Sequence, residues 1–209
     1  MNKILKQAIS KMRKLETVEA IAIVGSHTRK PKQNPHNIDF IIINTKKLTP
    51  KKLQEITMGK KSANFATISC DAIQFNYFGT VLSFVQLTPK QINSMLKKII
   101  SESGIAKKNR KWCIGWWVPE AFCGDIALCK ILFDKSGNLS RWKKILSKYP
   151  QKLQKNILLN SKYVFKKKIK KYLTEKNEAK RNLALSEAIF EALRISFAKN
   201  KEYFFGIQI

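Results

Sequence analysis

The chain has 209 residues, of which 44% are hydrophobic and 10% are aromatic, a composition that excludes a disordered chain and provides for a sizeable core. Forty-one Lys and Arg against fourteen Asp and Glu give a formal net charge of +27, which favours polyanionic partners but does not define a fold. Only six of these basic residues are Arg, so a general preference for Lys explains part of the excess.

The N-terminal sixteen residues mix apolar and basic side chains at helical spacing and lack the apolar core of a signal peptide. No segment approaches the ~18 apolar residues of a membrane span. The cysteines have neither CxxC spacing nor a neighbouring His, which argues against zinc and indicates buried thiols in a reducing compartment. They are Cys70, Cys113, Cys123 and Cys129. We therefore expect a cytoplasmic protein with no membrane partner.

The first part of the chain alternates helix and strand patterns. Apolar residues at helical spacing predict a helix over residues 4–15, and the apolar run 20–24 predicts a buried strand that ends at Gly25. A polar loop with two prolines, residues 27–37, leads to a β-branched strand over residues 38–43. This order predicts a sheet with at least one helix against it.

Further elements follow up to about residue 100. Thr49 and Pro50 predict a helix start, with Thr as the cap and Pro in the first turn. The segments "TISCDAIQF" and "TVLSFVQL" predict two strands joined by a hairpin loop, "NYFG". Thr88 and Gln91 then stand at capping-box spacing at the start of another helix.

From Pro119 onward, helical periodicity dominates. A turn at "DKSGN" and a final helix in which apolar residues step by four complete this part; those residues are Leu185, Ile189, Leu193 and Phe197. The predicted fold class is α+β, a mixed sheet with flanking helices followed by a C-terminal helical half. We place an α+β domain over residues 1–118 and a helical substrate-binding domain over residues 119–209.

The stretch "AIAIVGSHTRKPKQNPHNIDFIIIN" contains the most informative pattern. Gly25 and Ser26 follow the first strand, and Asn37 and Asp39 begin the second after ten intervening residues. Residues two apart on a strand face the same side, so positions 37 and 39 can share a ligand. A bound cation would explain an acid within an apolar strand.

This stretch resembles the signature of the DNA polymerase β-like nucleotidyltransferases, whose members include small enzymes that adenylylate antibiotics. The resemblance implies a nucleotidyltransferase-like fold and transfer of a nucleoside monophosphate from a triphosphate, with ATP as the expected nucleotide, to a hydroxyl. It also implies Mg²⁺ or Mn²⁺ held by Asn37, Asp39 and Asp71, with Asp39 and Asp71 catalytic. Gly25, Ser26 and Arg29 would bind the phosphates.

The sequence departs from the family at Asn37, where the family has Asp, so metal affinity should be lower. An alternative function is therefore a catalytically weakened or inactive nucleotidyltransferase-fold module that binds RNA or a protein partner. The acceptor of an active enzyme, a small molecule or RNA, cannot be read from the sequence. Restoring Asp at position 37 separates the two alternatives.

Later segments are also similar to small-substrate nucleotidyltransferases. "WWVPEAFCGDIALCKILFDKSGNLSRW" contains Asp134 and Gly137 in an "ILFD-x-x-G" context, and "ISFAKNKEYF" contains Asn200 and Tyr203 near a helix end. Glu120 is either a general base or an acid that stabilises a helix N-terminus.

Other residues keep two interpretations each. Asp125 is a second candidate general base. His27 and His36 either donate hydrogen bonds to phosphates or are solvated loop residues, and the second is expected. Trp112, Trp116 and Trp117 either stack on a base or pack in a core. The basic run 162–171 is interpreted as a solvated helix face that binds RNA weakly and without specificity.

Overall fold

The computed structural model describes residues 3–29, 37–57, 60–66, 71–77, 80–100 and 119–205. The chain divides into two compact units, each made of two chain segments. The first unit comprises Met1–Ser94 and Asp125–Ser147, and the second comprises Met95–Gly124 and Lys148–Ile209. Each unit is described separately below.

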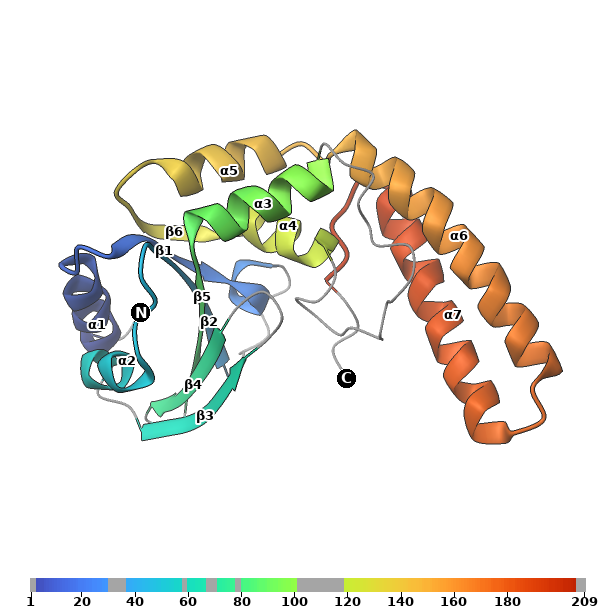
Figure 1. Ribbon diagram of the computed structural model, residues 1–209, viewed down its shortest axis with the longest axis horizontal. Helices are drawn as coiled ribbons and strands as arrows, with labels where there is room; N and C mark the ends of the chain where they lie inside the picture. Colours follow the sequence, from blue (N-terminus) through green and yellow to red (C-terminus); the bar gives the residue numbers. More distant parts are fainter. Residues whose placement is uncertain are drawn as a thin grey trace. The chain divides into compact units, whose positions relative to one another are not determined.

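The first unit is built on a six-stranded mixed sheet with the order β3-β4-β5-β2-β1-β6 (Figure 1). Only the pairing of β2 with β5 is parallel. The strands are β1 (Val18–Val24), β2 (Asn37–Asn44), β3 (Lys60–Ala66), β4 (Asp71–Tyr77), β5 (Thr80–Leu87) and β6 (Lys130–Asp134). The predicted α+β class with a mixed sheet is confirmed.

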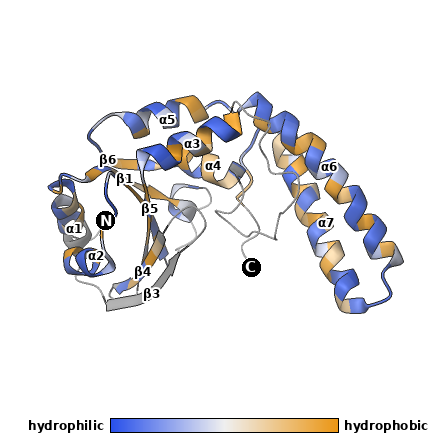
Figure 2. Ribbon diagram, viewed as in Figure 1, coloured by the Kyte–Doolittle hydropathy of each residue, from blue (hydrophilic) through white to orange (hydrophobic). Residues whose placement is uncertain are grey.

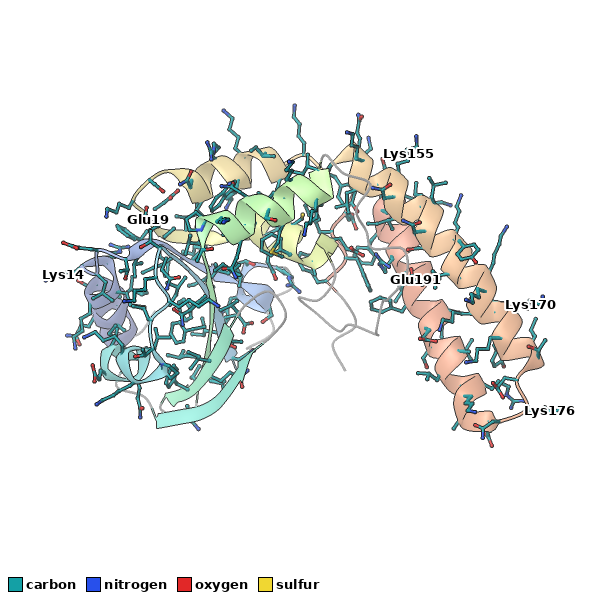
Figure 3. All side chains as sticks on the ribbon, in the orientation of Figure 1. Lys14, Glu19, Lys155, Lys170, Lys176 and Glu191 are labelled. Atoms are coloured by element: carbon teal, nitrogen blue, oxygen red, sulfur yellow. The ribbon has the colours of Figure 1, made fainter. Side chains whose placement is uncertain are left out.

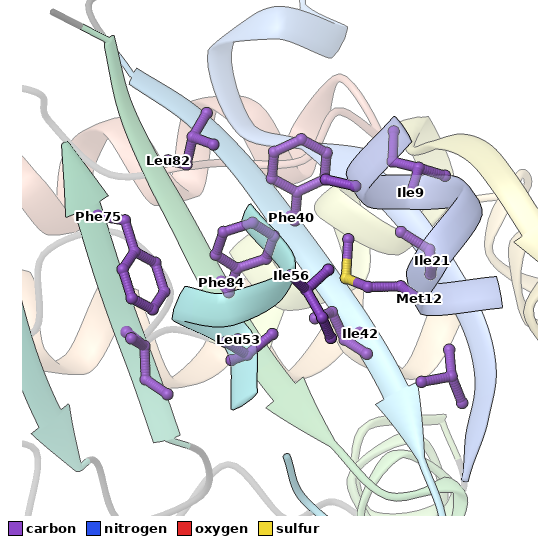
Figure 4. Packing of buried hydrophobic residues seen from close by; sticks show 13 residues of the cluster. Ile9, Met12, Ile21, Phe40, Ile42, Leu53, Ile56, Phe75, Leu82 and Phe84 are labelled. Carbon is purple, nitrogen blue, oxygen red and sulfur yellow. The ribbon is translucent and has the colours of Figure 1, made fainter. Parts of the chain in front are cut away.

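Helices α1 (Lys3–Arg13) and α2 (Pro50–Thr57) pack on one face of this sheet through a continuous apolar core (Figure 4). Phe40 of β2 and Phe84 of β5 stack with ring centroids 5.0 Å apart. Met12 of α1 and Leu53 of α2 are fully buried in the same cluster. Because side chains alternate along a strand, Phe40 inside this core places its neighbour Asp39 on the opposite face.

Local side-chain bonds fix several helix starts. The Thr49 hydroxyl accepts a bond from the Lys52 amide at the start of α2, as predicted. Thr88 and Gln91 form the predicted capping box at the start of α3 (Pro89–Ile100), with reciprocal bonds of 2.7 and 3.2 Å. The hairpin between β4 and β5 is also confirmed, because Tyr77 pairs with Thr80.

The strand β6 lies in the part of the chain where the sequence predicts mainly helices. It pairs with β1 and leads into α5 (Asn138–Leu146). The Asp134 carboxylate accepts bonds from the amides of Leu139 and Ser140, 3.3 and 2.7 Å long, and Gly137 adopts a φ of 70°. The "ILFD-x-x-G" segment therefore caps a helix and forms a turn that favours glycine.

The second unit contains two long helices, α6 (Gln151–Thr174) and α7 (Glu178–Lys199), which lie side by side (Figure 1). Figure 2 shows that both helices mix hydrophilic and hydrophobic residues along their length. The buried side of α7 includes Ala184, Ala188 and Ala198, whereas Ile189 of the predicted apolar series is 49% exposed. Phe190 is buried as well, so small alanine side chains, which a search for large apolar residues passes over, make part of this face.

The end of α7 folds back onto α4 (Pro119–Leu128), which contributes residues up to Gly124 to the second unit. Lys201 adopts a left-handed φ of 58°, and the Glu202 amide bonds the Phe197 carbonyl at 2.9 Å. A Cβ on Gly124 would lie 2.5 Å from the Phe205 ring and 2.7 Å from Tyr203 Cβ. The "ISFAKNKEYF" segment thus ends a helix and packs against a glycine.

Within the described part of the chain, no helix combines the length and apolar character that crossing a membrane requires.

Candidate functional site

Asp39 lies on β2 between the end of β1 and the middle of β5, and it is half-buried. It pairs with Val24 of β1 on one side and Ser83 of β5 on the other. Burial raises the pKa of this carboxyl group, while a hydrogen bond from Ser83 and the nearby His27 and Arg29 act in the opposite direction. A carboxylate that is costly to ionise in this position is suited to a cationic ligand.

Gly25 ends β1 directly beside this carboxylate. Its φ is +73°, a left-handed conformation that side chains rarely adopt, and a Cβ here would lie 2.5 Å from Asp39 Oδ2. Two independent reasons therefore require glycine at this position. Because Gly25 has no side chain, the main chain lies close to the Asp39 carboxylate.

A short 3-10 turn, η1 (Gly25–Thr28), follows and carries Ser26 and then Arg29. The Thr28 hydroxyl donates to the Gly25 carbonyl at 2.9 Å, which closes the turn. Ser26 and Arg29 are both half-buried beside Gly25. The predicted phosphate-binding residues therefore stand on one turn next to Asp39.

Asp125 of α4 holds this turn in place through two hydrogen bonds. Its Oδ1 accepts a 2.8 Å bond from Arg29 Nη2 and a 3.3 Å bond from the Gly25 amide. The carboxylate is completely buried, and its Oδ2 has no hydrogen-bond partner. Burial, with a smaller contribution from the charge of Asp39, raises its pKa to about 6 despite the opposing effects of Arg29 and the Gly25 amide.

Asn37 stands two residues before Asp39 on β2, and their side chains meet as the spacing predicts. Asn37 Nδ2 donates to Asp39 Oδ1 at 3.3 Å. The amide thus occupies the place in which a second carboxylate would repel Asp39. Both residues are half-buried.

The strand register separates Asp71 from Asp39. Asp71 pairs with Gln86 of β5, three residues along that strand from Ser83, which pairs with Asp39. The β4 residue in the row of Asp39 and Ser83 is Gln74. Register therefore does not favour the predicted sharing of one metal by Asp39 and Asp71, because three positions correspond to about 10 Å along a strand.

Ser83 and Gln74 are site residues that sequence reasoning missed. Gln74 Nε2 donates to Ser83 Oγ at 3.4 Å, and Ser83 in turn bonds Asp39. Together they continue a polar row from β2 across β5 to β4. The available signal was the break in an apolar strand, since Ser83 interrupts "TVLSFVQL" in the middle.

These residues provide oxygen donors for a hard divalent cation, but few charges. Asp39, Asn37 and Ser83 offer carboxylate, amide and hydroxyl oxygens, a donor set that fits Mg²⁺ or Mn²⁺ with water completing the shell. Among the described residues, no group of three His, Cys, Asp or Glu side chains could hold a metal. Asp39 is thus the single carboxylate of this donor set.

Several other candidates lie elsewhere. Glu120 is completely buried in the second unit, where it accepts a bond from Arg194 Nε. His27 is exposed on η1, in agreement with the expected solvated residue. Cys123 and Cys129 are buried free thiols. Outside the described residues lie Lys30, Lys32, His36, Cys70, Cys113 and the three tryptophans Trp112, Trp116 and Trp117.

Comparison with known proteins gives similarities of two kinds, to a sequence family and to solved structures. A family described as a domain of unknown function, DUF4037, matches residues 124–206. A nucleotidyltransferase-like protein from Exiguobacterium sibiricum 255-15 has a similar structure, with a TM-score of 0.45 and 12% sequence identity. The similarity covers 96% of this chain and 58% of the other, so this chain spans little more than half of that protein. No curated protein sequence matched.

Proposed function

We propose that the first unit binds a nucleoside triphosphate together with one divalent cation, Mg²⁺ or Mn²⁺, and that ATP is the nucleotide. The observation that supports this most directly is the position of Asp39 Oδ2, where a Cβ on Gly25 would lie 2.5 Å away. The carboxylate proposed as the cation ligand thus lies directly beside the main chain that would admit the phosphates. Ser26 and Arg29 lie on the same turn.

Each residue has a distinct part in this proposal. Asp39, with the oxygens of Asn37 and Ser83, would hold the cation that neutralises triphosphate charge. Ser26 would donate to a phosphate oxygen, and Arg29 would place its guanidinium beside the phosphates. Asp125 orients Arg29 through the 2.8 Å bond to Nη2. Since the pKa of Asp39 is raised, cation binding should strengthen as pH rises and the carboxylate ionises.

The test is calorimetric titration of ATP into the full chain with Mg²⁺ and with EDTA. Asp39→Asn removes the only carboxylate proposed as a cation ligand, and we expect the Mg²⁺-dependent part of the affinity to fall at least about tenfold. Glu55→Gln is the matched control, because Glu55 is an exposed acid on α2. Within the described residues its only ion pair is with Lys52, which is also exposed. Equal Mg²⁺ dependence in wild type and Asp39→Asn refutes the proposal.

A second candidate function is transfer of a nucleoside monophosphate to a hydroxyl of a small molecule or RNA. The observation that favours it is the second carboxylate, Asp125, which is close enough for Asp39 to raise its pKa. In this reaction the acceptor oxygen forms a bond to the α-phosphorus, the bond to the bridging oxygen breaks, and pyrophosphate leaves. The hydroxyl proton passes to solvent or to a carboxylate.

Pyrophosphate release, screened over nucleotides, metals and acceptors, tests the second candidate. Asn37→Asp adds a carboxylate beside Asp39, so we expect turnover to rise at least about tenfold if transfer is limited by metal affinity. Absence of release from both wild type and Asn37→Asp, in proteins that still bind ATP, rules out transfer and leaves nucleotide binding as the function. Retained release in Asp39→Ala contradicts the placement of the site.

A further inference from the structure

The long helix α6 carries eight Lys and no acid: Lys152, Lys155, Lys162, Lys166, Lys167, Lys168, Lys170 and Lys171. Its neighbour α7 differs, because it contains Glu178, Glu187 and Glu191. Acidic residues are absent from the whole sequence between Asp134 and Glu175. No acid within this segment itself therefore balances its positive charge.

Burial separates the lysines of α6 into an inner and an outer group. Lys168 faces α7, where its ammonium group pairs with Glu187. The buried residues Leu153, Ile157 and Ser161 mark the same inner side. The lysines from 166 to 171 surround the helix, as the sequence indicates, so a stripe becomes evident only when the earlier lysines are included.

The outer side of α6 carries five exposed lysines, here called the Lys stripe: Lys152, Lys155, Lys162, Lys166 and Lys170. At 100° per residue, all five lie within about 80° of the helix circumference. From Lys152 to Lys170 the stripe is about 27 Å long, since each residue adds 1.5 Å. Figure 3 labels Lys155 near one end of α6 and Lys170 near the other.

An exposed aromatic ring lies at the edge of the Lys stripe, about midway along its length. Tyr163 is 69% exposed, and it stands three residues before Lys166, a spacing that makes the two side chains neighbours on a helix. Aromatic rings between basic side chains are the arrangement in which proteins stack single-stranded bases while they neutralise the backbone.

We propose that the Lys stripe with Tyr163 binds a single strand of nucleic acid. The phosphate backbone supplies the negative charge that α6 lacks, and a base stacks on Tyr163. An anionic membrane is the less favoured occupant, because lysines interrupt the exposed apolar residues Leu159 and Leu173 and no continuous apolar face remains. The proposal does not depend on nucleotide binding by the first unit.

The experiment measures binding of a labelled twelve-nucleotide RNA, and of DNA with the same sequence, by fluorescence anisotropy from 20 to 200 mM salt. We expect log affinity to fall with log salt at a slope of about −3.5 if five phosphates are contacted. The comparison of RNA with DNA identifies which strand is preferred, and binding of either through the stripe supports the proposal.

Two variants remove the same charge from different places. Gln at Lys155, Lys162, Lys166 and Lys170 should weaken binding at least about thirtyfold at low salt and reduce the slope. Gln at Lys6, Lys11, Lys46 and Lys51, which are exposed in the first unit, should weaken binding less than about threefold. Equal losses in both variants overturn the proposal, because they indicate attraction by net charge alone.

Tyr163 separates stacking from charge. Tyr163→Ala should weaken binding about tenfold, whereas Tyr163→Phe, which keeps the ring, should remain within about twofold of wild type. Vesicles of phosphatidylserine and phosphatidylcholine complete the experiment. Binding of these vesicles through the Lys stripe, without binding of either nucleic acid, overturns the proposal in favour of a membrane surface.

Discussion

Asp125 is a completely buried carboxylate that both fixes Arg29 and titrates in an accessible range. Burial raises its pKa from 3.8 to about 6, so the folded protein binds this proton more tightly than the unfolded chain. Ionising the group therefore costs folding free energy. Stability contributed by protonated Asp125 is present below about pH 4 and is lost as pH rises to about 6.

We expect Asp125→Asn to flatten this pH dependence. Two pKa units correspond to about 3 kcal/mol in the free energy of unfolding between pH 4 and pH 6. Asn keeps an oxygen that can accept the bonds from Gly25 and Arg29, so the comparison isolates the charge. Urea denaturation of both proteins in EDTA, from pH 4 to pH 7, measures the difference. Identical pH profiles contradict the assignment.

At the residue scale, the sequence identified site residues that are close together along the chain, but not those that the fold brings in from distant positions. Gly25, Ser26, Arg29, Asn37 and Asp39 are close in sequence, and the structure brings them together. Asp125 follows Gly25 by a hundred residues, and only the packing of a helix on the sheet places it there. Asp71 fits the expected pattern of an acid within a strand, but its position relative to Asp39 depends on how the strands pair.

Among the elements, α4 and α7 are joined by a buried ionic group that contains two acids and one base. Arg194 donates to Glu120 and to Glu191, and all three side chains are almost fully buried. Burial disfavours the charged guanidinium, but the two carboxylates together outweigh burial and raise its pKa. The group as a whole carries one excess negative charge.

Because of this excess negative charge, removing the cation should destabilise the protein more than removing one of the two acids. Arg194→Met leaves two buried carboxylates without a cation and should cost about 3 to 5 kcal/mol in the free energy of unfolding. Glu120→Gln removes one charge, leaves Arg194 paired with Glu191, and keeps an oxygen acceptor, so it should cost less than about 1 kcal/mol. Urea midpoints of both variants test this. Equal losses would show that the excess charge is balanced elsewhere.

The elements themselves were predicted where the local signal is strong. The caps at Thr49 and Thr88 and the hairpin before Thr80 depend on adjacent residues, and the structure confirms them. The strand β6 has five residues, too few for a periodic pattern to show, and β1 stabilises it by pairing. The buried face of α7 was predicted only in part: Leu193 and Phe197 pack against its apolar cluster, but its buried positions are alanines, Phe190 and an ion group.

On the scale of the whole molecule, the net charge of +27 is distributed unevenly along the chain. Acids occur in the sheet unit at Asp39, Asp125 and Asp134, whereas α6 has none. Composition alone suggested a general Lys preference, and it could not show that the lysines of one helix share a side. Helical spacing along the sequence shows that they share a side, and the packing of α6 against α7 determines that this side is exposed.

The position of β6 late in the chain also affects the order in which the sheet can form during synthesis. The sheet receives five strands from residues up to 87 and its last strand, beside β1, from Lys130–Asp134. A chain emerging from the ribosome therefore carries β1 as an open edge until more than forty further residues have been synthesised. Open edges pair readily with other chains, so this interval is the period in which the nascent protein depends most on protection from aggregation.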